Sequence, residues 1–478
     1  MNSQFKNITL VFSLICAVNF NAKSEQNCNL DKLFSSNSSN LNLTTAGLKL
    51  KIESDFSKAL SLKQNVDPFA DTVPSLFVPA TLQMSGINRT FKAEIKARGN
   101  SVLIDPEVTF PKLKIEISDD ENLTGTPFDK QRNFRINTHL ADVKQSRNSE
   151  LTGRLLGDLS PIRENLAYTI ARFFGLAAPQ TQLAQVTYVD TQTHGSSDHV
   201  ALLIETDKKI AKRLKSEIVD TFGPQGAQIK VSSQDAALFM TYHALVGNAD
   251  YSLKVHEKDL METEKNRYYW NTFIIKTETG SYVPVVYDLD LATIVTQKQI
   301  EMGSQFKFTE FGLQDAKQAY FFSRYAKLRQ KLSDADLLKA FNYVNSRLDQ
   351  LKNIVSTSGL DAQTKSNALE HFEYFAKYYT QAMTSKVIAV ADMHFYEKAN
   401  LKSKKKTILS KSDNKALPLR PGTPIKILAE EGDFYKVAIL DINGDLQQNQ
   451  SSVGYIKKSA VGDHVSDDLL GWQDERDI

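Results

Sequence analysis

"PIRENLAYTIARFFGL", residues 161–176, is the stretch at which the hydrophobic pattern of this chain changes its period. Leu166, Ile170 and Phe174 recur at intervals of four, which predicts an amphipathic helix, and Gly175 supplies a stop signal. Most segments before this helix alternate like strands, and most segments after it have the period of helices. The sequence therefore predicts an α+β fold in which a strand-rich part precedes a helix-rich part.

Upstream of this helix, apolar and polar residues alternate in short runs separated by turn residues, a pattern typical of antiparallel strands. These runs cover residues 48–53, 80–86, 89–99, 110–117 and 133–140.

Downstream, two further strands are expected at 181–190 and 199–206. They are followed by a helix that Ser232 or Ser233 caps and Gly247 ends. The helical pattern then continues almost to Phe395. Its main runs cover residues 322–332, 334–355 and 366–383.

With 478 residues and 41% hydrophobic content, the chain can bury a sizeable core. Its 58 basic and 56 acidic residues leave a net charge of +2. Such a balance favours neither a nucleic-acid partner nor a membrane surface, so function has to be inferred from local sites.

Residues 1–22 have the length and flanks of a cleaved signal peptide, with an uncleaved anchor or a buried helix as the alternatives. Cleavage would make the protein exported, either periplasmic or extracellular. Of the two cysteines only Cys28 would remain, which excludes an internal disulfide. We expect no transmembrane segment in the mature chain.

We expect the main domain to span 23–395 and a Lys-rich linker to span 396–415. Short alternating strands with Gly/Pro turns at 416–463 predict a small separate β-domain, and 464–478 form a tail.

"SYVPVVYDLDLATIV", residues 281–295, places Asp288 and Asp290 inside an apolar run. Carboxylates at alternate positions of a strand end point the same way, so both can reach one cation or one transferring group. Upstream, Asp250 follows the helix that ends at Gly247, and Asn271 opens a strand. Taken as residue types alone, turn residues and a solvated hairpin are the commoner interpretation.

Phosphoryl transfer needs a carboxylate that activates the attacking hydroxyl, and an Asn and an Asp that hold a metal ion. The order of these and other motifs resembles the spore-coat-H (CotH) kinase family, an atypical protein-kinase-like group. The similarity runs from Lys96 to Asp290, about 40% of the chain. Its motifs are KARGNS, FPKLKIEI, RENLAYTIARFFGL, VTYVDT, VALLIET, LVGNADYS, WNTFII and YVPVVYDLD.

The resemblance implies a bilobal kinase-like domain that uses ATP and Mg or Mn to phosphorylate a protein Ser/Thr hydroxyl. Asp250 would be the base, and Lys114 with Glu164 would form a phosphate clamp. Asn271 and Asp288 would be metal ligands, with Asp290 a second ligand or only a neighbour. The remaining ATP-binding positions would be Arg98, Gly99, Asn100 and Ser101 in the turn over the phosphates, and Glu205 near the adenine.

Each of these positions also has an ordinary structural interpretation. Lys114 can be an outward strand residue, Glu164 a residue of a first helical turn, and Glu205 a surface residue at a strand end. Lys112 and Arg135 compete with Lys114 for the phosphate role.

The chain departs from the family pattern in its metal-binding region. Twenty residues, 251–270, separate Asp250 from Asn271, which we interpret as an insertion, with Asn266 as the fallback ligand. Other sites are disfavoured: the eight histidines lack zinc-protease spacing, and His243 is expected to be packed.

The carboxy-terminal part resembles bacterial SH3-like domains. The resemblance implies a small barrel that binds cell-wall or other short peptides through Phe434, Tyr435 and Tyr455, unless these aromatic residues form its core. Two rival functions remain open at this point. One is an inactive kinase-shaped scaffold at the cell envelope, and the other is nucleotidyl transfer on the same fold.

Overall fold

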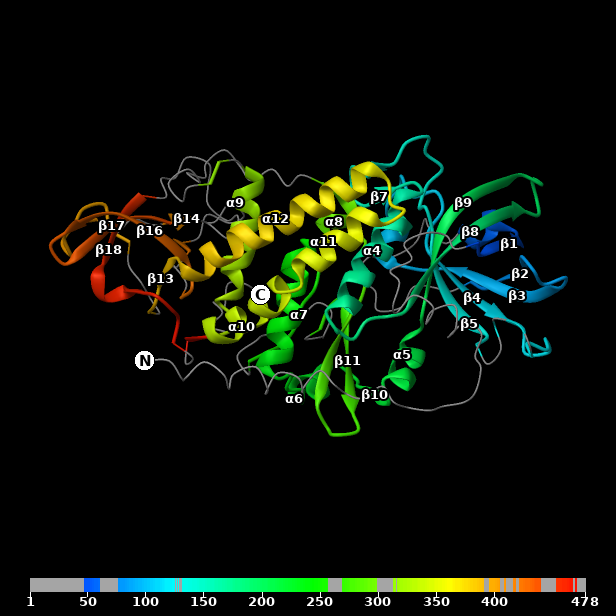
Figure 1. Ribbon diagram of the computed structural model, residues 1–478, viewed down its shortest axis with the longest axis horizontal. Coiled ribbons are helices and arrows are strands. Elements are labelled where there is room, and N and C mark those ends of the chain that lie inside the picture. The colour runs from blue at the N-terminus through cyan, green and yellow to red at the C-terminus, as the bar shows by residue number, and fades with distance from the viewer. Residues whose placement is uncertain are drawn as a thin grey trace, which may run out of the picture.

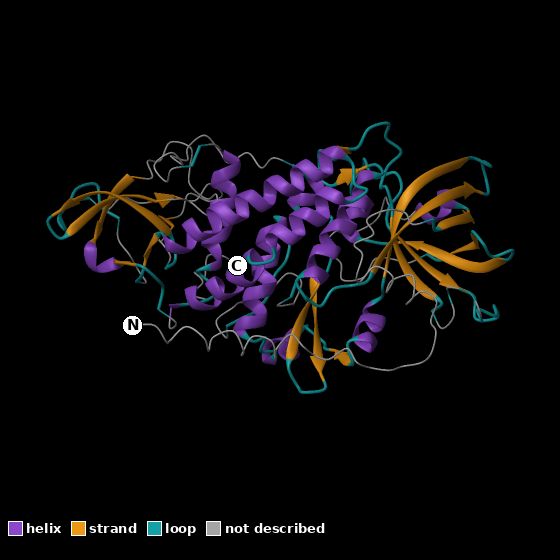
Figure 2. Cartoon of the chain, viewed as in Figure 1, coloured by secondary structure: helices purple, strands orange, loops and turns teal. Residues whose placement is uncertain are grey.

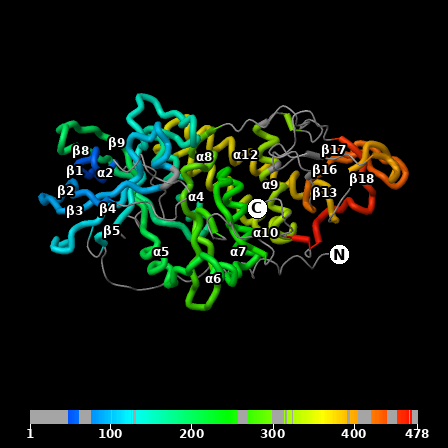
Figure 3. Tube along the Cα trace, turned by 180° about the vertical axis from the view of Figure 1, so that it is seen from behind, coloured from blue at the N-terminus to red at the C-terminus, as the bar shows by residue number. Residues whose placement is uncertain are grey.

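Strands lie at one end of the molecule, helices at its centre and a small second group of strands at the other end (Figures 1 and 2), and the view from behind shows the same order (Figure 3). The predicted separation into a strand-rich and a helix-rich part is therefore confirmed. This computed structural model describes residues 47–60, 76–124, 126, 128, 131–256, 269–298, 313–314, 316–390, 395–404, 408–409, 416–417, 421–439, 453–466 and 469–470.

The strand-rich part is a closed seven-stranded barrel with the order β1-β2-β3-β4-β5-β9-β8. All neighbours are antiparallel except β1 and β8, which pair in parallel and close the barrel. Two short helices, α2 (Phe56–Leu60) and α3 (Asn100–Leu103), follow β1 and β3. The strands are β1 (Lys49–Ser54), β2 (Val78–Met84), β3 (Thr90–Ala97), β4 (Leu113–Ile117), β5 (Asn133–Asn137), β8 (Thr181–Asp190) and β9 (Ser196–Ile204).

Alternation along these strands fills the barrel, because every second side chain points inward. In β4, Leu113, Ile115 and Ile117 are buried, while Lys114 lies on the outer face and is partly exposed. Between β5 and α4 lies the minor pair β6 (Arg147–Asn148) and β7 (Leu155–Leu156).

The helix predicted around residues 161–176 is α4 (Leu159–Phe173), which joins the barrel to the helical part (Figure 1). It is buried on most sides, and Gly175 follows it with a φ of 77°. Its apolar residues belong to the main core, together with residues of β8 and β9. This burial on both sides makes α4 a rigid support for any polar side chain that it carries.

After β9 the chain forms α5 (Asp207–Arg213), a three-stranded sheet and the helical part. The sheet has the order β10-β11-β12 and comprises β10 (Ser216–Ile218), β11 (Thr272–Thr277) and β12 (Tyr282–Val286). The other helices are α6 (Gly223–Gln228), α7 (Ser233–Val246), α8 (Thr293–Thr296), α9 (Ala316–Leu328), α10 (Asp334–Asn345), α11 (Leu348–Thr357) and α12 (Ala362–Thr384).

Helix α7 begins and ends where the sequence predicts. Ser232 caps it by accepting a hydrogen bond from the Asp235 backbone N–H, and Gly247 ends it with a left-handed φ of 67°. A Cβ at position 247 would lie 2.7 Å from the Cβ of Thr293, so only glycine fits there.

The carboxy-terminal sheet has the order β18-β17-β16-β13-β19. Two very short strands, β14 (Ile408–Leu409) and β15 (Ala416–Leu417), pair beside it, and η3 (Lys458–Ala460) precedes its last strand. The strands of the sheet are β13 (Lys386–Ile388), β16 (Pro424–Glu431), β17 (Phe434–Ile439), β18 (Val453–Lys457) and β19 (Val461–Gly462).

This sheet begins earlier than the predicted boundary at 416. β13 follows α12 at once and pairs with β16 and β19. Within and beside the predicted linker, Phe395 packs in the core of the sheet and Tyr396 pairs with Tyr455. Phe395 and Tyr396 therefore belong to the carboxy-terminal sheet, whose strand β13 begins two residues after α12.

Three other predictions concern residues that the structure leaves undescribed. They are the signal peptide at 1–22, the fallback ligand Asn266, and most of the tail at 464–478; Cys16 and Cys28 also lie outside the described residues. Among the described helices, none combines the length and apolar character that crossing a membrane requires.

Candidate functional site

Six of the predicted site residues lie together at the point where α4, the segment before β4 and the segments after α7 and β12 meet. They come from separate stretches of the chain that approach this point from both sides. Lys112 precedes β4, Glu164 lies on α4, Asp250 follows α7, Asn271 precedes β11, and Asp288 and Asp290 follow β12.

Lys112 is at the centre of this group. Its ammonium Nζ lies 2.8 Å from Oδ1 of Asp288 and 2.9 Å from Oδ2 of Asp290. The Lys112 side chain is only 3% exposed and that of Asp290 only 1%. Burial by itself lowers the pKa of Lys112, but the two carboxylates outweigh burial and hold the pKa above its usual range. Lys112 is therefore a permanent buried cation.

Asp290 receives a second cation, because Nε of the buried Arg154 lies 2.7 Å from the same oxygen, Oδ2. Burial raises the pKa of Asp290, and Arg154 with Lys112 more than reverses this, so the carboxyl is ionised. Within the described part of the chain its other oxygen, Oδ1, is buried without a hydrogen-bond partner. An anionic oxygen in that position can ligate a cation.

Glu164 faces this cluster from α4. Asn137 donates from Nδ2 to both carboxylate oxygens of Glu164 at 2.7 Å, and Arg98 in turn donates to the amide oxygen of Asn137. Burial raises the pKa of Glu164 to about 7, although Lys112 opposes the shift. Glu164 thus combines a fixed position with a proton affinity close to neutrality.

Replacing Glu164 with Gln should change how stability depends on pH. A carboxyl whose pKa is raised on folding favours the native state at low pH, and this contribution is lost as pH rises from about 4.5 to about 7. A tenfold difference in proton affinity is worth about 1.4 kcal/mol, so the native chain should lose up to a few kcal/mol relative to Glu164→Gln across this interval. Urea unfolding of both proteins at the two ends of the interval measures the difference. The exposed Glu278→Gln variant controls for loss of one charge, and a difference that does not vary with pH would contradict the prediction.

Asp250 and Asn271 lie together despite the twenty residues between them. Nδ2 of Asn271 donates to Oδ2 of Asp250 at 2.7 Å, and Nε1 of Trp270 donates to Oδ1 at 3.0 Å. An antiparallel bridge between Ser252 and Trp270 closes the base of the intervening loop. The length of the insertion therefore does not separate the two predicted residues.

The environment of Asp250 is suited to a base. Burial raises its pKa, Trp270 opposes the shift, and the nearby Asp288 and Asp290 add to it. A carboxylate whose pKa is raised towards neutrality accepts a proton more readily than an exposed one.

The backbone is strained at two of the predicted metal ligands. Asn271 and Asp288 have left-handed φ values of 47° and 50°. Asn and Asp tolerate this region better than most residues, and such strain is concentrated at functional sites. The Asp288 backbone is held there by a hydrogen bond of 3.0 Å from its N–H to the hydroxyl of Tyr168.

The expected clamp between Lys114 and Glu164 is not what the structure shows. Lys114 lies on the outer face of β4 and forms an ion pair with Glu116. Its neighbours Leu113 and Ile115 point into the barrel core, so strand alternation turns Lys114 outward. Lys112, the competitor named from the sequence, occupies the position next to the acidic residues.

Arg135, the other competing cation, is also engaged elsewhere. Its guanidinium forms a bidentate pair with Asp207 at 2.7 Å and donates to the Tyr287 hydroxyl at 3.0 Å. Arg135 thus links β5 to α5.

The remaining predicted residues have separate environments. Gly99 turns the chain with a φ of 91°, and the N–H of Arg98 donates to the carbonyl of Lys112 at 2.9 Å, so this turn adjoins Lys112. Asn100 and Ser101 open α3. Glu205 is buried rather than exposed, and Arg213 holds it at 2.8 Å where β9 ends.

Three residues that contact the site were not predicted from the sequence: Arg154, Asn137 and Tyr168. Arg154 and Asn137 belong to no motif, and Tyr168 lies inside RENLAYTIARFFGL without an assigned role. Each is recognisable only by the carboxylate or backbone group that it contacts. His243, predicted to be packed, is fully buried and stacks on Tyr251 at 4.1 Å.

In the carboxy-terminal sheet, the three aromatic residues predicted for a contact surface have different environments. Phe434 is buried against Tyr396, which excludes it from a surface. Tyr435 is half-buried against the core of the sheet, and Tyr455 donates from its hydroxyl to Glu431 at 2.9 Å.

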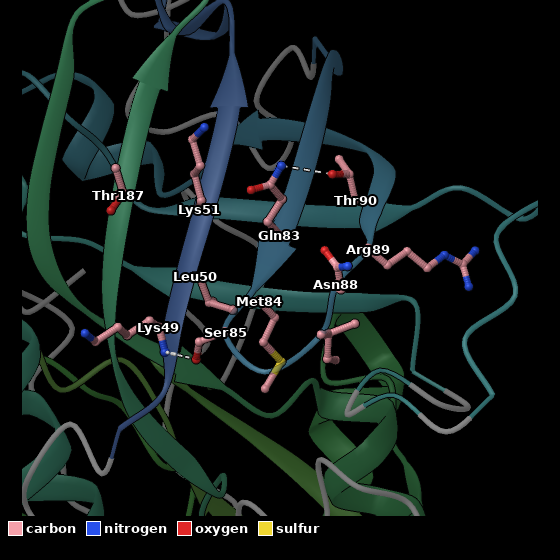
Figure 4. A pocket seen from close by; sticks show the side chains of 11 residues that line it. Lys49, Leu50, Lys51, Gln83, Met84, Ser85, Asn88, Arg89, Thr90 and Thr187 are labelled. Carbon is pink, nitrogen blue, oxygen red and sulfur yellow. Dashed lines mark hydrogen bonds between the residues drawn. The ribbon is translucent and has the colours of Figure 1, made fainter.

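A hollow of about 440 Å³ lies on the outside of the barrel, where β1, β2 and the turn before β3 meet (Figure 4). It is lined partly by the basic residues Lys49, Lys51 and Arg89. Arg89 is already paired with Glu121 at 2.6 Å, and none of the residues of the buried cluster lines this hollow.

Comparison with known proteins adds no relative: no family model matches the chain, and no curated protein matches it. The function must therefore be argued from the geometry described above.

Proposed function

We propose that this protein is an exported, bilobal kinase-like enzyme that transfers the γ-phosphoryl group of ATP to a protein Ser/Thr hydroxyl in a metal-dependent reaction. The observation that carries the proposal is the buried cluster in which Lys112 joins Asp288 and Asp290, with Arg154 on the same oxygen of Asp290. Phosphoryl transfer depends on fixed charges around the phosphates more than on covalent chemistry, and such a cluster provides them.

The order of the elements supports the same proposal. The helical part is preceded by a strand that follows Lys112, the helix that carries Glu164, two further strands and a short connection. The strand-rich lobe of a kinase has the same order. The closed barrel departs from that pattern, because a kinase lobe has an open sheet.

The residues have the following roles in the proposed reaction. Asp250 accepts the proton of the attacking hydroxyl at its raised pKa. Asn271, held by Asp250, with Asp288 and Asp290 would hold the metal, and Oδ1 of Asp290 offers an oxygen without a partner in the described chain. When bound, Mg or Mn supplies positive charge between the phosphates. Lys112 rather than Lys114 provides the protein cation, and Glu164 lies beside it.

An inactive scaffold explains the cluster less well. Buried charges cost several kcal/mol when they are left unpaired, and a protein that only binds partners has no need to retain Glu164, Asp250, Asp288 and Asp290 around one lysine. The second rival, nucleotidyl transfer, needs the same metal and lysine and differs in which phosphate reacts.

Labelled ATP separates these functions. The purified chain, incubated with Mg or Mn and a general protein acceptor, should transfer label from the γ position and none from the α position. Asp250→Asn should lower the rate by about 10²-fold, since loss of a general base typically costs that much or more. Glu278→Asn, at an exposed turn, is the control. Transfer only from the α position would replace the kinase by a nucleotidyl transferase, and absence of both binding and transfer would leave the scaffold.

For the carboxy-terminal sheet we propose a peptide-binding role at the cell envelope, with Tyr435 and Tyr455 as contact residues. Tyr435 lies beneath the ammonium of Lys458 at 5.2 Å, and Tyr455 keeps a hydroxyl at the surface. The buried Phe434 is excluded from this role.

A further inference from the structure

A second group of polar side chains lies where β5, β9 and the start of α4 meet, and none of its members belongs to the proposed catalytic cluster. His139 follows β5, Asp142 lies in the next turn, and His199 is on β9. One ligand atom from each of these three residues lies within 4.8 Å of the other two. Residues from three different segments therefore converge on one point.

Both imidazoles approach the same oxygen. Nε2 of His139 lies 3.2 Å and Nε2 of His199 lies 2.7 Å from Oδ1 of Asp142. The rings are stacked with centroids 3.5 Å apart and planes only 7° apart, so the two Nε2 atoms lie side by side. Both Nε2 atoms therefore face Oδ1 of Asp142, as in a metal site in which imidazole nitrogens and a carboxylate oxygen converge on one ion.

The carboxylate of Asp158 fixes the ring of His199. Nδ1 of His199 lies 3.1 Å from Oδ1 of Asp158, which also accepts a hydrogen bond from the Val200 N–H. A carboxylate that accepts from one imidazole nitrogen leaves the other nitrogen as the ligand, an arrangement common around zinc.

The other ring is held by packing. His139 is fully buried and stacks on Phe110 at 5.1 Å, and its Nδ1 has no hydrogen-bond partner in the described chain.

We propose that His139, Asp142 and His199 form a binding site for a divalent transition metal, zinc by preference, with Asp158 as the outer partner of His199. Two imidazoles and one carboxylate form a ligand set that zinc accepts. Three protein ligands leave the fourth position of a tetrahedral ion to solvent, and the 63% exposure of the Asp142 side chain gives water access to the site. Binding requires the two rings to tilt until both lone pairs point at the ion.

This site would tie together the end of β5, β9 and the start of α4. It is independent of the proposed kinase reaction, because its residues are neither the base nor the ligands assigned to Mg or Mn.

Zinc retention by the full chain tests the proposal. Chelator-treated protein is mixed with equimolar zinc sulfate, desalted and measured for metal content, and a chromophoric competitor gives the affinity. We expect one zinc ion per chain, with affinity reduced at least about tenfold in Asp142→Ala and His199→Ala. Asp158→Asn should weaken binding by about 10- to 100-fold while keeping the stoichiometry.

Two controls make the result specific. His194→Ala removes an exposed histidine from the turn between β8 and β9 and should leave zinc binding unchanged. Asp288→Asn should also leave it unchanged, which separates this site from the catalytic cluster. Asp142 is exposed, so Asp142→Ala should fold even if His139→Gln does not. If the native chain retains no zinc, or if Asp142→Ala and His199→Ala bind it as tightly as the native chain, the proposal is wrong.

Discussion

Replacing Lys112 with Met should lower the rate of phosphoryl transfer by about 10² to 10³-fold or more, whereas Lys114→Met should leave it near that of the native chain. Removal of one group that stabilises transition-state charge typically costs this much. Lys112 lies 2.8 and 2.9 Å from Asp288 and Asp290, but Lys114 pairs with Glu116 on the outer face of the barrel. Initial rates with labelled ATP at matched protein concentrations measure both variants.

Loss of Lys112 also affects folding, and the experiment has to separate the two effects. Breaking a buried ion pair by removal of one partner typically costs about 3 to 5 kcal/mol, although Arg154 still neutralises Asp290. Lys112→Arg retains the charge and is the second variant. The transfer rate of each protein is measured at a temperature below its own unfolding midpoint. Activity that survives in Lys112→Met and disappears in Lys114→Met would show that the buried cluster is structural and that the outer lysine is functional.

The ambiguity between these two lysines shows how far sequence patterns reach. The run FPKLKIEI alternates so regularly that a strand is predicted from Phe110, and the structure begins β4 at Leu113. Inside a strand, Lys112 and Lys114 would share one face. Because the strand begins between them, Lys112 lies in the preceding segment and enters the site instead. Strand ends depend on tertiary packing, so the pattern could name both lysines and could not choose between them.

Local signals predicted several elements well. β8 occupies residues Thr181–Asp190 as expected from its alternation, and α7 has the predicted cap and the predicted glycine stop. Closure of the barrel was not predictable, because it rests on pairing of β1 with β8, for example Leu50 with Val186. Neither strand carries a signal for a partner so distant in sequence, and β13 was missed for the same reason.

For the site, the sequence supplied the residues whose type and position are unusual, such as Asp250, Asn271 and the two carboxylates after β12. It could not supply Arg154 or Asn137, because a single Arg or Asn has no meaning until its partner is known. The residues between Asp250 and Asn271 were interpreted as an insertion, and the bridge from Ser252 to Trp270 is the physical reason that Asp250 and Asn271 still lie together.

The second large effect should come from Arg329, which connects the helical part to the carboxy-terminal sheet. Its guanidinium is fully buried and donates five hydrogen bonds. Two go to Asp334 at the start of α10, at 2.8 and 2.7 Å, and two to the carbonyls of Ala382 and Ser385 at the end of α12, at 3.0 and 2.8 Å. The fifth goes to the carbonyl of Asp463, directly after β19.

Arg329→Met should therefore destabilise the protein by about 3 to 5 kcal/mol, since it leaves the Asp334 carboxylate and several buried carbonyls without their donor. Arg329→Lys should recover less than half of this loss, because an ammonium cannot reproduce the planar five-donor fork. Arg347→Met, which removes a half-buried arginine stacked on Tyr343 in the same helical part, should cost no more than about 1 kcal/mol. Urea unfolding gives the three values, and limited proteolysis shows whether the carboxy-terminal sheet loosens first. Equal stability of Arg329→Met and Arg347→Met would mean that apolar packing, including Val387 of β13, rather than this arginine, fixes the sheet to α12.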